Sequence, residues 1–226
     1  MKNNSKTAAV IFDMDGVLVD SYQAHFQSWR RMAQTHGQDM TEQQFAATFG
    51  RTTREIITAI WGDHVSGDEV AVWDDQKELA YRRILDEDFP AMHGAGVLLE
   101  SLRRAGIKLA IGSSGPPENV ELVLKHLGRD IFAAAVTARD VTHGKPHPEV
   151  FLKAAGKLRV DPIDCAVVED APAGIQAART AGMIAIGLTG TAPRQELAAE
   201  AHIVVDSLDE LSPEKIVSLI TEATDR

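Results

Sequence analysis

The stretch TAAVIFDMDG at residues 7–16 decides the fold of this chain. Its apolar part has no polar alternation and ends abruptly in acidic residues, which indicates a strand that is buried on both faces of a parallel sheet. Similar apolar runs recur at residues 107–112, 133–137, 165–168 and 184–188, with a candidate sixth at 203–205. The sequence therefore predicts five buried strands and a candidate sixth.

Helical patterns lie between these runs. Apolar residues recur with helical spacing at residues 97–104, 118–127, 148–158 and 173–181. Strands that alternate with helices form a parallel sheet with helices on both faces. The predicted fold class is α/β, a doubly wound, Rossmann-like core.

One segment, residues 21–90, interrupts this alternation. It shows helical periodicity at residues 26–33, 56–61 and 72–85 and contains no convincing strand. We therefore expect an inserted all-α unit at residues 21–90, and a core formed by residues 1–20 and 91–226. All three tryptophans of the chain fall in the insert, where we interpret them as packing residues.

The charge balance limits the classes of partner. The 226 residues include 23 basic and 33 acidic side chains, a net charge of −10. Nucleic-acid binding needs a basic field, so we expect no nucleic-acid partner. A small anionic substrate remains compatible, because a bound cation reverses the sign of the charge locally. The single cysteine, Cys165, excludes an internal disulfide and is expected to be a buried side chain.

The N-terminal residues and the lengths of the apolar runs indicate neither a signal peptide nor a membrane span. Residues 1–6 are polar, and the apolar stretch after them is too short for a signal peptide. No run approaches the ~18 apolar residues of a membrane span. We expect a cytoplasmic monomer without a membrane partner.

Chemically active side chains follow four of the predicted strands. In open parallel sheets, ligands bind beyond the carboxyl ends of the strands. The residues at these ends are Asp13, Asp15, Ser113, Ser114, Lys145, Glu169 and Asp170. Chance would scatter such residues over both edges of the sheet, so their grouping predicts a site.

The residue types indicate the chemistry. Asp13 and Asp15 are two positions apart on an extended segment, so both carboxylates face the same side. A divalent cation relieves their repulsion, and oxygen ligands favour Mg²⁺ over zinc. One carboxylate can attack phosphorus, the second can move the proton, and Ser113 with nearby amides can bind the phosphoryl group. Pro116 and Pro117 suit the start of a helix whose positive end faces that group.

The order of these residues resembles the four motifs of haloacid dehalogenase superfamily phosphatases. The matching segments are Asp13-x-Asp15-Gly-Val, Ser113, Lys145-Pro-x-Pro and Glu169-Asp170. The insert resembles the small helical cap of that superfamily, in the β-phosphoglucomutase and sugar-phosphate phosphatase branch. The resemblance extends over essentially the whole chain.

The resemblance implies a role for each motif residue. Asp13 is implied as nucleophile and metal ligand, and Asp15 as acid/base with its backbone carbonyl on the metal. Ser113 and Lys145 are implied to hold the phosphoryl group. Ser114 is a further candidate for phosphate binding, with capping of the following helix as its alternative role. Asp170 is implied to bind Mg²⁺, with Glu169 beside it or in contact with the ligands.

Basic residues of the insert are candidates for substrate contacts. His25 matches a histidine of β-phosphoglucomutase at the junction of cap and core, and residues 50–54 resemble the family's specificity loop. Arg51, Arg54 and Lys77 could reach a substrate, although a solvated charged face explains them equally well. His143 and His147 flank Lys145 at a spacing typical of metal ligands, but the intervening prolines argue against a helix, so we interpret both as loop residues.

The predicted function is a Mg²⁺-dependent phosphomonoester hydrolase that acts on a small phosphorylated metabolite, with a sugar phosphate expected, through an aspartyl phosphate. A β-phosphoglucomutase-type mutase uses the same core and stays open as the alternative. A non-catalytic binding protein on this fold is a more distant alternative, because none of the motif residues is missing. Dehalogenases lack the second aspartate, which is present here as Asp15.

Overall fold

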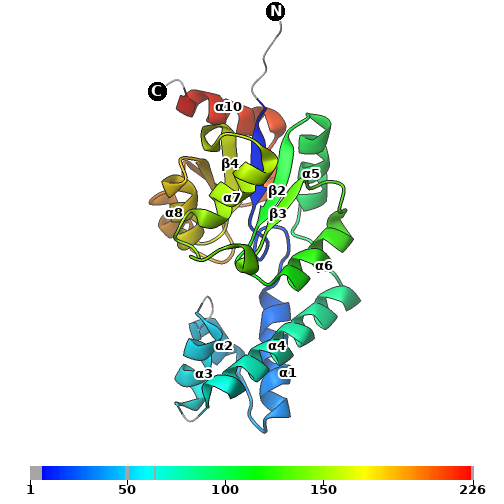
Figure 1. Ribbon diagram of the computed structural model, residues 1–226, viewed down its shortest axis with the longest axis vertical. Helices are drawn as coiled ribbons and strands as arrows, with labels where there is room; N and C mark the ends of the chain where they lie inside the picture. The colour runs from blue at the N-terminus through cyan, green and yellow to red at the C-terminus, as the bar shows by residue number, and fades with distance from the viewer. Residues whose placement is uncertain (1–6, 49–50, 64, 225–226) are drawn as a thin grey trace, which may run out of the picture. The chain divides into compact units, whose positions relative to one another are not determined.

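The computed structural model describes residues 7–48, 51–63 and 65–224. Its centre is a six-stranded parallel sheet in the order β3-β2-β1-β4-β5-β6 (Figure 1). The strands are β1 Ala9–Phe12, β2 Lys108–Gly112, β3 Ala134–Val136, β4 Cys165–Glu169, β5 Ile184–Leu188 and β6 Ile203–Val205. All six predicted strands, including the short candidate at 203–205, are confirmed.

The first strand lies in the middle of the sheet. It pairs in parallel with β2 on one side and with β4 on the other. All four residues of β1 have no exposed surface, which explains why its sequence is apolar without alternation. The strand order reverses direction at β1, and ligands of doubly wound sheets bind at such a point.

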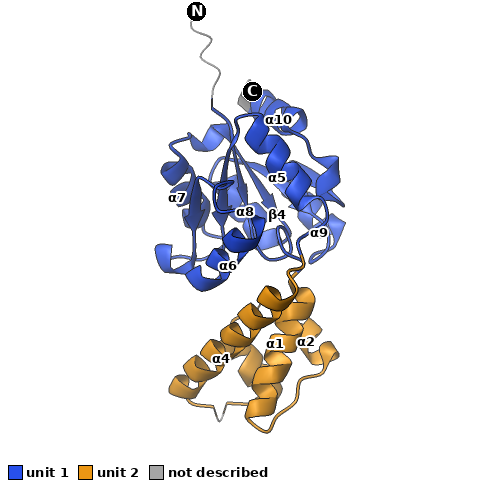
Figure 2. Ribbon diagram, turned by 90° about the vertical axis from the view of Figure 1, so that its right-hand side faces the viewer, with its two compact units in different colours: residues 1–20, 91–226 blue, residues 21–90 orange. Residues whose placement is uncertain are grey.

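Helices cover both faces of the sheet (Figures 1 and 2). The helices around the sheet are α5 Ala95–Arg104, α6 Pro117–Leu127, α7 Glu149–Leu158, α8 Pro172–Thr180, α9 Arg194–Ala198 and α10 Pro213–Thr224. On one face, Ala9 and Ile11 pack in a buried cluster with residues of α7 and α8. The doubly wound α/β prediction is confirmed, whereas α9 and α10 were not anticipated from the sequence.

The expected environment of Cys165 is also observed. Its side chain is fully buried at the start of β4, in the cluster that contains Ile11 and Phe151. Burial raises the pKa of the Cys165 thiol to about 12, with smaller contributions from the charges of Asp164 and Asp161. The thiol is therefore a packing group at neutral pH.

The helical insert forms the second of two compact units, Ser21–Pro90, and the remainder of the chain forms the first (Figure 2). Its helices are α1 Tyr22–Thr35, α2 Glu42–Thr48, α3 Thr53–Trp61 and α4 Gly67–Glu87. Trp29 and Trp73 are buried in a core with Met32 and Phe45, and the rings of Trp61 and Trp73 lie 5.6 Å apart. The tryptophans therefore pack the insert; the short helix α2 was not expected.

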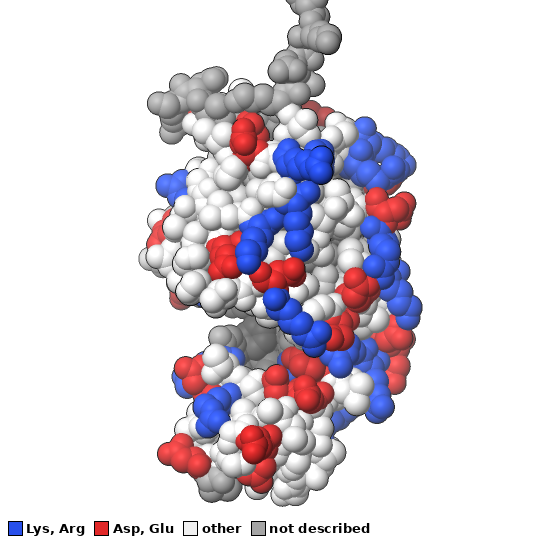
Figure 3. Space-filling model, in the orientation of Figure 1, with Lys and Arg blue, Asp and Glu red and all other residues white. Residues whose placement is uncertain are grey.

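The surface carries both signs of charge. Basic and acidic side chains are interspersed over the face that Figure 3 shows. Among the described residues, no helix combines the length and the apolar character that crossing a membrane requires.

Candidate active site

Asp13, Lys145 and Glu169 form an ion-paired group beyond the carboxyl ends of the strands. Asp13 directly follows β1, and its backbone N–H donates to the Val168 carbonyl at 3.0 Å, which continues the pairing with β4. The Lys145 ammonium donates to Asp13 Oδ1 at 2.5 Å and to Glu169 Oε1 at 2.7 Å. All three side chains are at most 11% exposed, so these contacts hold in a region with little water.

Lys145 is placed by the loop that follows β3. Its ammonium also lies 5.0 Å from the centre of the Phe151 ring, which belongs to α7. A lysine on a solvated surface would have neither a buried carboxylate partner nor an aromatic one. Lys145 is therefore a residue of the buried site and not of the solvated surface.

Asp170 completes the acidic group. Ligand-competent oxygens of Asp13, Glu169 and Asp170 all lie within 4.8 Å of one another. Asp170 is buried, and it accepts a hydrogen bond from the side chain of Thr191. Three carboxylates therefore face a single ammonium group, and the site has an excess of negative charge.

This excess is visible in the pKa values. Burial raises the pKa of Asp13 to about 7, against the opposing charge of Lys145 and with help from the charges of Glu169 and Asp15. Burial and the charges of Glu169 and Asp13 raise the pKa of Asp170 well above its ordinary value. Burial alone would lower the pKa of Lys145, but the carboxylates of Asp13 and Glu169 raise it above its ordinary value.

The group has the composition of a site for a hard cation. Its donors are all oxygens, which suit Mg²⁺ rather than zinc. A divalent cation would offset the charge that one lysine leaves uncompensated, and it would favour the ionised forms of Asp13 and Asp170. Glu169 is engaged by Lys145 and also accepts from the Ala171 N–H at 2.8 Å, so Asp13 and Asp170 are the better ligands.

Asp15 lies on a tight loop that begins at the end of β1. The Gly16 N–H donates to the Val19 carbonyl at 2.8 Å, and the Leu18 N–H donates to the Met14 carbonyl at 2.9 Å. Asp15 is half-buried, and its negative charge contributes to the raised pKa of Asp13. The loop therefore brings both aspartates of the first motif into one electrostatic environment.

Ser113 lies at the end of β2, next to this group in the sheet order. Its N–H donates to the Val136 carbonyl at 3.0 Å, and its hydroxyl oxygen accepts from the Gly115 N–H at 2.9 Å. The hydroxyl is buried, and its proton remains available to an anion. Ser114 is exposed, and helix α6 begins after Pro116 without a capping side chain, so the capping reading of Ser114 is wrong.

Two glycines and one threonine of the site have roles that were not assigned from the sequence. A Cβ on Gly16 would lie 1.9 Å from Asp170 Oδ2, and one on Gly174 would lie 1.7 Å from Glu169 Oε1. Both positions therefore need glycine so that backbone can approach a carboxylate. The strand-end rule could have found Thr191, because it closely follows β5, and Gly16 belongs to the Asp13-x-Asp15-Gly-Val motif. The close approach at Gly174 leaves no signal of either kind in the sequence.

The candidates of the insert separate into two groups. His25 and Lys77 meet: His25 Nδ1 lies 3.1 Å from Lys77 Nζ, and the His25 ring stacks on Tyr81 with centroids 4.2 Å apart. Lys77 is buried and also donates to Glu78, so it does not belong to a solvated charged face.

Arg51 and Arg54 are exposed. Between them, Thr52 caps helix α3 in a reciprocal pair with Glu55, so part of residues 50–54 has a structural role. Gly50 lies outside the described residues.

The chain matches known proteins over most of its length. The family model described as haloacid dehalogenase-like hydrolase matches residues 7–182. Validoxylamine A 7'-phosphate phosphatase of Streptomyces hygroscopicus subsp. limoneus is 34% identical over 211 residues, with 89% of this chain and 94% of that protein covered. Beta-phosphoglucomutase of Bacillus subtilis (strain 168) is 36% identical over 196 residues, with 80% and 82% covered.

A solved structure agrees with these matches. The structure of HAD hydrolase, family IA, variant 3 from Entamoeba histolytica HM-1:IMSS superposes with a TM-score of 0.84 at 29% identity, and the match covers 95% of this chain and 100% of that one. The family match, the two relatives and the shared fold have one conclusion in common: the chain belongs to the haloacid dehalogenase-like hydrolases.

Proposed function

We propose that this protein is a Mg²⁺-dependent phosphomonoester hydrolase that acts on a small sugar phosphate through an aspartyl phosphate at Asp13. As a haloacid dehalogenase-like hydrolase, the protein is an enzyme of the phosphatase or phosphotransferase class. The observation that carries the proposal is the Asp13 carboxylate, which is buried at the end of β1 and held by Lys145. A further relative, the fructose-1-phosphate phosphatase YqaB of Escherichia coli (strain K12), is 36% identical over 181 residues and supports the substrate class.

The proposed reaction has two displacements at phosphorus. In the first, an Asp13 oxygen forms a bond to phosphorus as the ester P–O bond breaks, and Asp15 gives its proton to the departing alcohol oxygen. In the second, Asp15 takes a proton from water, the water oxygen attacks phosphorus, and the Asp13–phosphate bond breaks. Inorganic phosphate is released and both aspartates return to their starting states.

The neighbouring residues stabilise the phosphoryl group. The Lys145 ammonium, already at Asp13 Oδ1, offers positive charge to the phosphoryl oxygens, and the Ser113 hydroxyl offers a hydrogen bond. Asp13, Asp170 and the backbone carbonyl of Asp15 would hold Mg²⁺, which when bound supplies further charge neutralisation. Glu169 fixes Lys145 through its 2.7 Å ion pair.

A phosphosugar mutase is the second candidate, and the 36% identity to a beta-phosphoglucomutase favours it. A mutase would pass the phosphoryl group from Asp13 to a sugar hydroxyl instead of to water. The two functions therefore differ in the acceptor, while the residues in the first displacement are the same.

An assay of both products separates the candidates. The purified protein is incubated with Mg²⁺ and a panel of phosphate esters that includes β-glucose 1-phosphate, with a trace of the bisphosphate as primer for that ester. Phosphate release that stops with EDTA supports the hydrolase. Glucose 6-phosphate without matching phosphate release assigns the mutase, and neither product from any ester contradicts both.

A further inference from the structure

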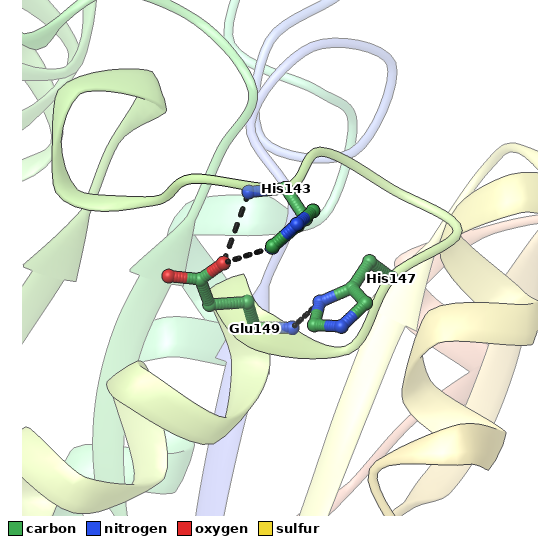
Figure 4. Close-up of side chains that lie close together, drawn as sticks. All are labelled: His143, His147 and Glu149. Carbon is green, nitrogen blue, oxygen red and sulfur yellow. Dashed lines mark hydrogen bonds and ion pairs between the residues drawn. The ribbon is translucent and has the colours of Figure 1, made fainter.

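A second cluster of possible metal ligands lies on the exposed loop before helix α7 and on the first residue of that helix. It consists of His143, His147 and Glu149. Figure 4 shows the His143 ring and the Glu149 carboxylate turned toward each other, with the His147 ring beside the Glu149 backbone nitrogen. One ligand-competent atom from each residue lies within 4.8 Å of the other two. The interpretation of the histidines as loop residues is confirmed, yet the turn between them brings the rings together as a helix would.

The carboxylate of this cluster is held in place by the loop itself. Glu149 Oε2 accepts from the backbone N–H groups of Thr142 at 3.1 Å and His143 at 2.9 Å, while Oε1 accepts from Lys153 at 2.7 Å. The side chain is only 16% exposed. The Lys153 contact and these backbone donors lower the pKa of Glu149 to about 2, so it is ionised wherever a histidine is neutral.

The two imidazoles complete the arrangement. His143 Nδ1 lies 3.3 Å from Glu149 Oε2, and the two rings have centroids 4.7 Å apart. His147 Nδ1 faces the Glu149 N–H at 3.3 Å. Ligand atoms at ~2.0–2.1 Å from a tetrahedral zinc ion are separated by about 3.4 Å, so His143 and Glu149 already have the spacing of two ligands of one ion.

We propose that His143, His147 and Glu149 form a second metal site, which binds one divalent transition metal ion of the zinc class. Two imidazole nitrogens and one carboxylate oxygen suit Zn²⁺, Co²⁺ or Ni²⁺ and are poor ligands for Mg²⁺. The metal takes the place of the proton between His143 and Glu149, and water fills the remaining position. The fixed carboxylate lowers the entropic cost of assembling the site, because only the exposed rings turn.

The site is distinct from the acidic group at Asp13 in its donors and in its exposure. Its histidines are exposed, whereas Asp13, Glu169 and Asp170 are buried. A purely structural role for Glu149, as acceptor for the loop N–H groups and partner of Lys153, accounts for the carboxylate alone. If Glu149 had only this structural role, replacing either histidine would not change the affinity for a metal ion, and this affinity can be measured.

The test is a Co²⁺ titration of the full chain in excess Mg²⁺, followed by visible absorption, with Zn²⁺ binding measured by calorimetry. We expect one equivalent of Co²⁺ with a spectrum of nitrogen ligation and low coordination number, displaced by Zn²⁺. Loss of a group that only orients a ligand costs about 10–100-fold in affinity, so His143→Ala and His147→Ala should each weaken binding by at least ~100-fold.

His93→Ala is the matched control. It removes an exposed imidazole that is also paired with a carboxylate, Asp209, at 2.7 Å, but that lies outside the cluster. Its Co²⁺ and Zn²⁺ affinities should equal those of the wild type. Because the altered histidines are exposed, thermal melting in EDTA should be unchanged in all three variants, which separates loss of the site from loss of the fold.

Two results would overturn the proposal. One is a wild-type affinity for Zn²⁺ in His143→Ala and His147→Ala. The other is a Co²⁺ signal that Asp170→Asn removes and the histidine variants retain, which would place all transition-metal binding at the acidic group. Neither readout depends on turnover, so the proposed phosphatase activity and this site stand or fall separately.

Discussion

Two groups of ligand-competent side chains lie in the first unit of this protein, and they differ in burial and in the number of carboxylates. Asp13, Glu169 and Asp170 are buried, and Lys145 neutralises only part of their charge. His143, His147 and Glu149 lie nearer the surface, and two of these three side chains are imidazoles instead of carboxylates. Burial therefore concentrates negative charge in the first group, whereas the second group has one carboxylate and is in contact with solvent.

Replacing Asp13 by Asn tests the buried group most severely. The amide cannot attack phosphorus and removes one metal-binding charge, so we expect turnover to fall ~10⁴-fold or more. The measurement is Mg²⁺-dependent phosphate release from the best ester of the panel. Asp39→Asn, at a carboxylate that is 62% exposed, is the control and should keep full activity. Substantial turnover in Asp13→Asn would exclude the aspartyl phosphate.

Replacing Asp15 by Ala tests the division of labour within the same motif. General acid and base catalysis contributes about 10²–10⁴-fold, and we expect a loss in that range in steady-state turnover. The loss should be smaller for esters with good leaving groups, such as p-nitrophenyl phosphate, because they need no protonation. An equal loss for both kinds of ester would remove Asp15 from the acid role.

Replacing Gly174 by Ala tests whether Glu169 must be held in place. The new Cβ would displace the Glu169 carboxylate from Lys145, and a misplacement of about 1 Å can cost ~100-fold in rate. We expect kcat to fall roughly 10- to 100-fold. Gly156→Ala, in helix α7 with nothing within 4 Å of the new Cβ, should retain full activity and gain up to about 1 kcal/mol of stability. Equal activity of both variants would show that Glu169 tolerates displacement.

The smallest expected effect is the pH dependence of Mg²⁺ binding to the buried group. Burial raises the pKa of Asp13 to about 7, so below that pH a proton competes with the cation for this carboxylate. Mg²⁺ affinity should be constant above pH ~8 and fall up to tenfold per pH unit below pH ~6.5 for each displaced proton. Calorimetry at several pH values measures this; an affinity independent of pH between 5.5 and 8 would contradict the shift.

The sequence predicts the strands and the motif residues for one reason. Strands buried on both faces must be apolar throughout, and parallel strands bring their carboxyl ends to one edge, so local patterns carry the information for β1 to β6 and for Asp13, Lys145 and Asp170. The class of fold and the family were predicted correctly from these patterns.

Other features depend on contacts between distant residues. The glycine at 174 looks like an ordinary helix position until Glu169 is placed against it. Thr191 was not predicted as a site residue because it carries no charge, although it follows a strand. The approach of His143 to Glu149 is set by a proline-containing turn, which has no periodicity to read.

The position of the insert has a consequence for the order in which the chain can fold during synthesis. Strand β1 is made first, but its partners β2 and β4 begin only at Lys108 and Cys165. The helices of Ser21–Pro90 form a compact unit whose residues are all made before β2, and structures with contacts closer in sequence form faster. We expect the insert to gain protection from hydrogen exchange on nascent chains while β1 remains exposed. Earlier protection of β1 would show that the core does not wait for its later strands.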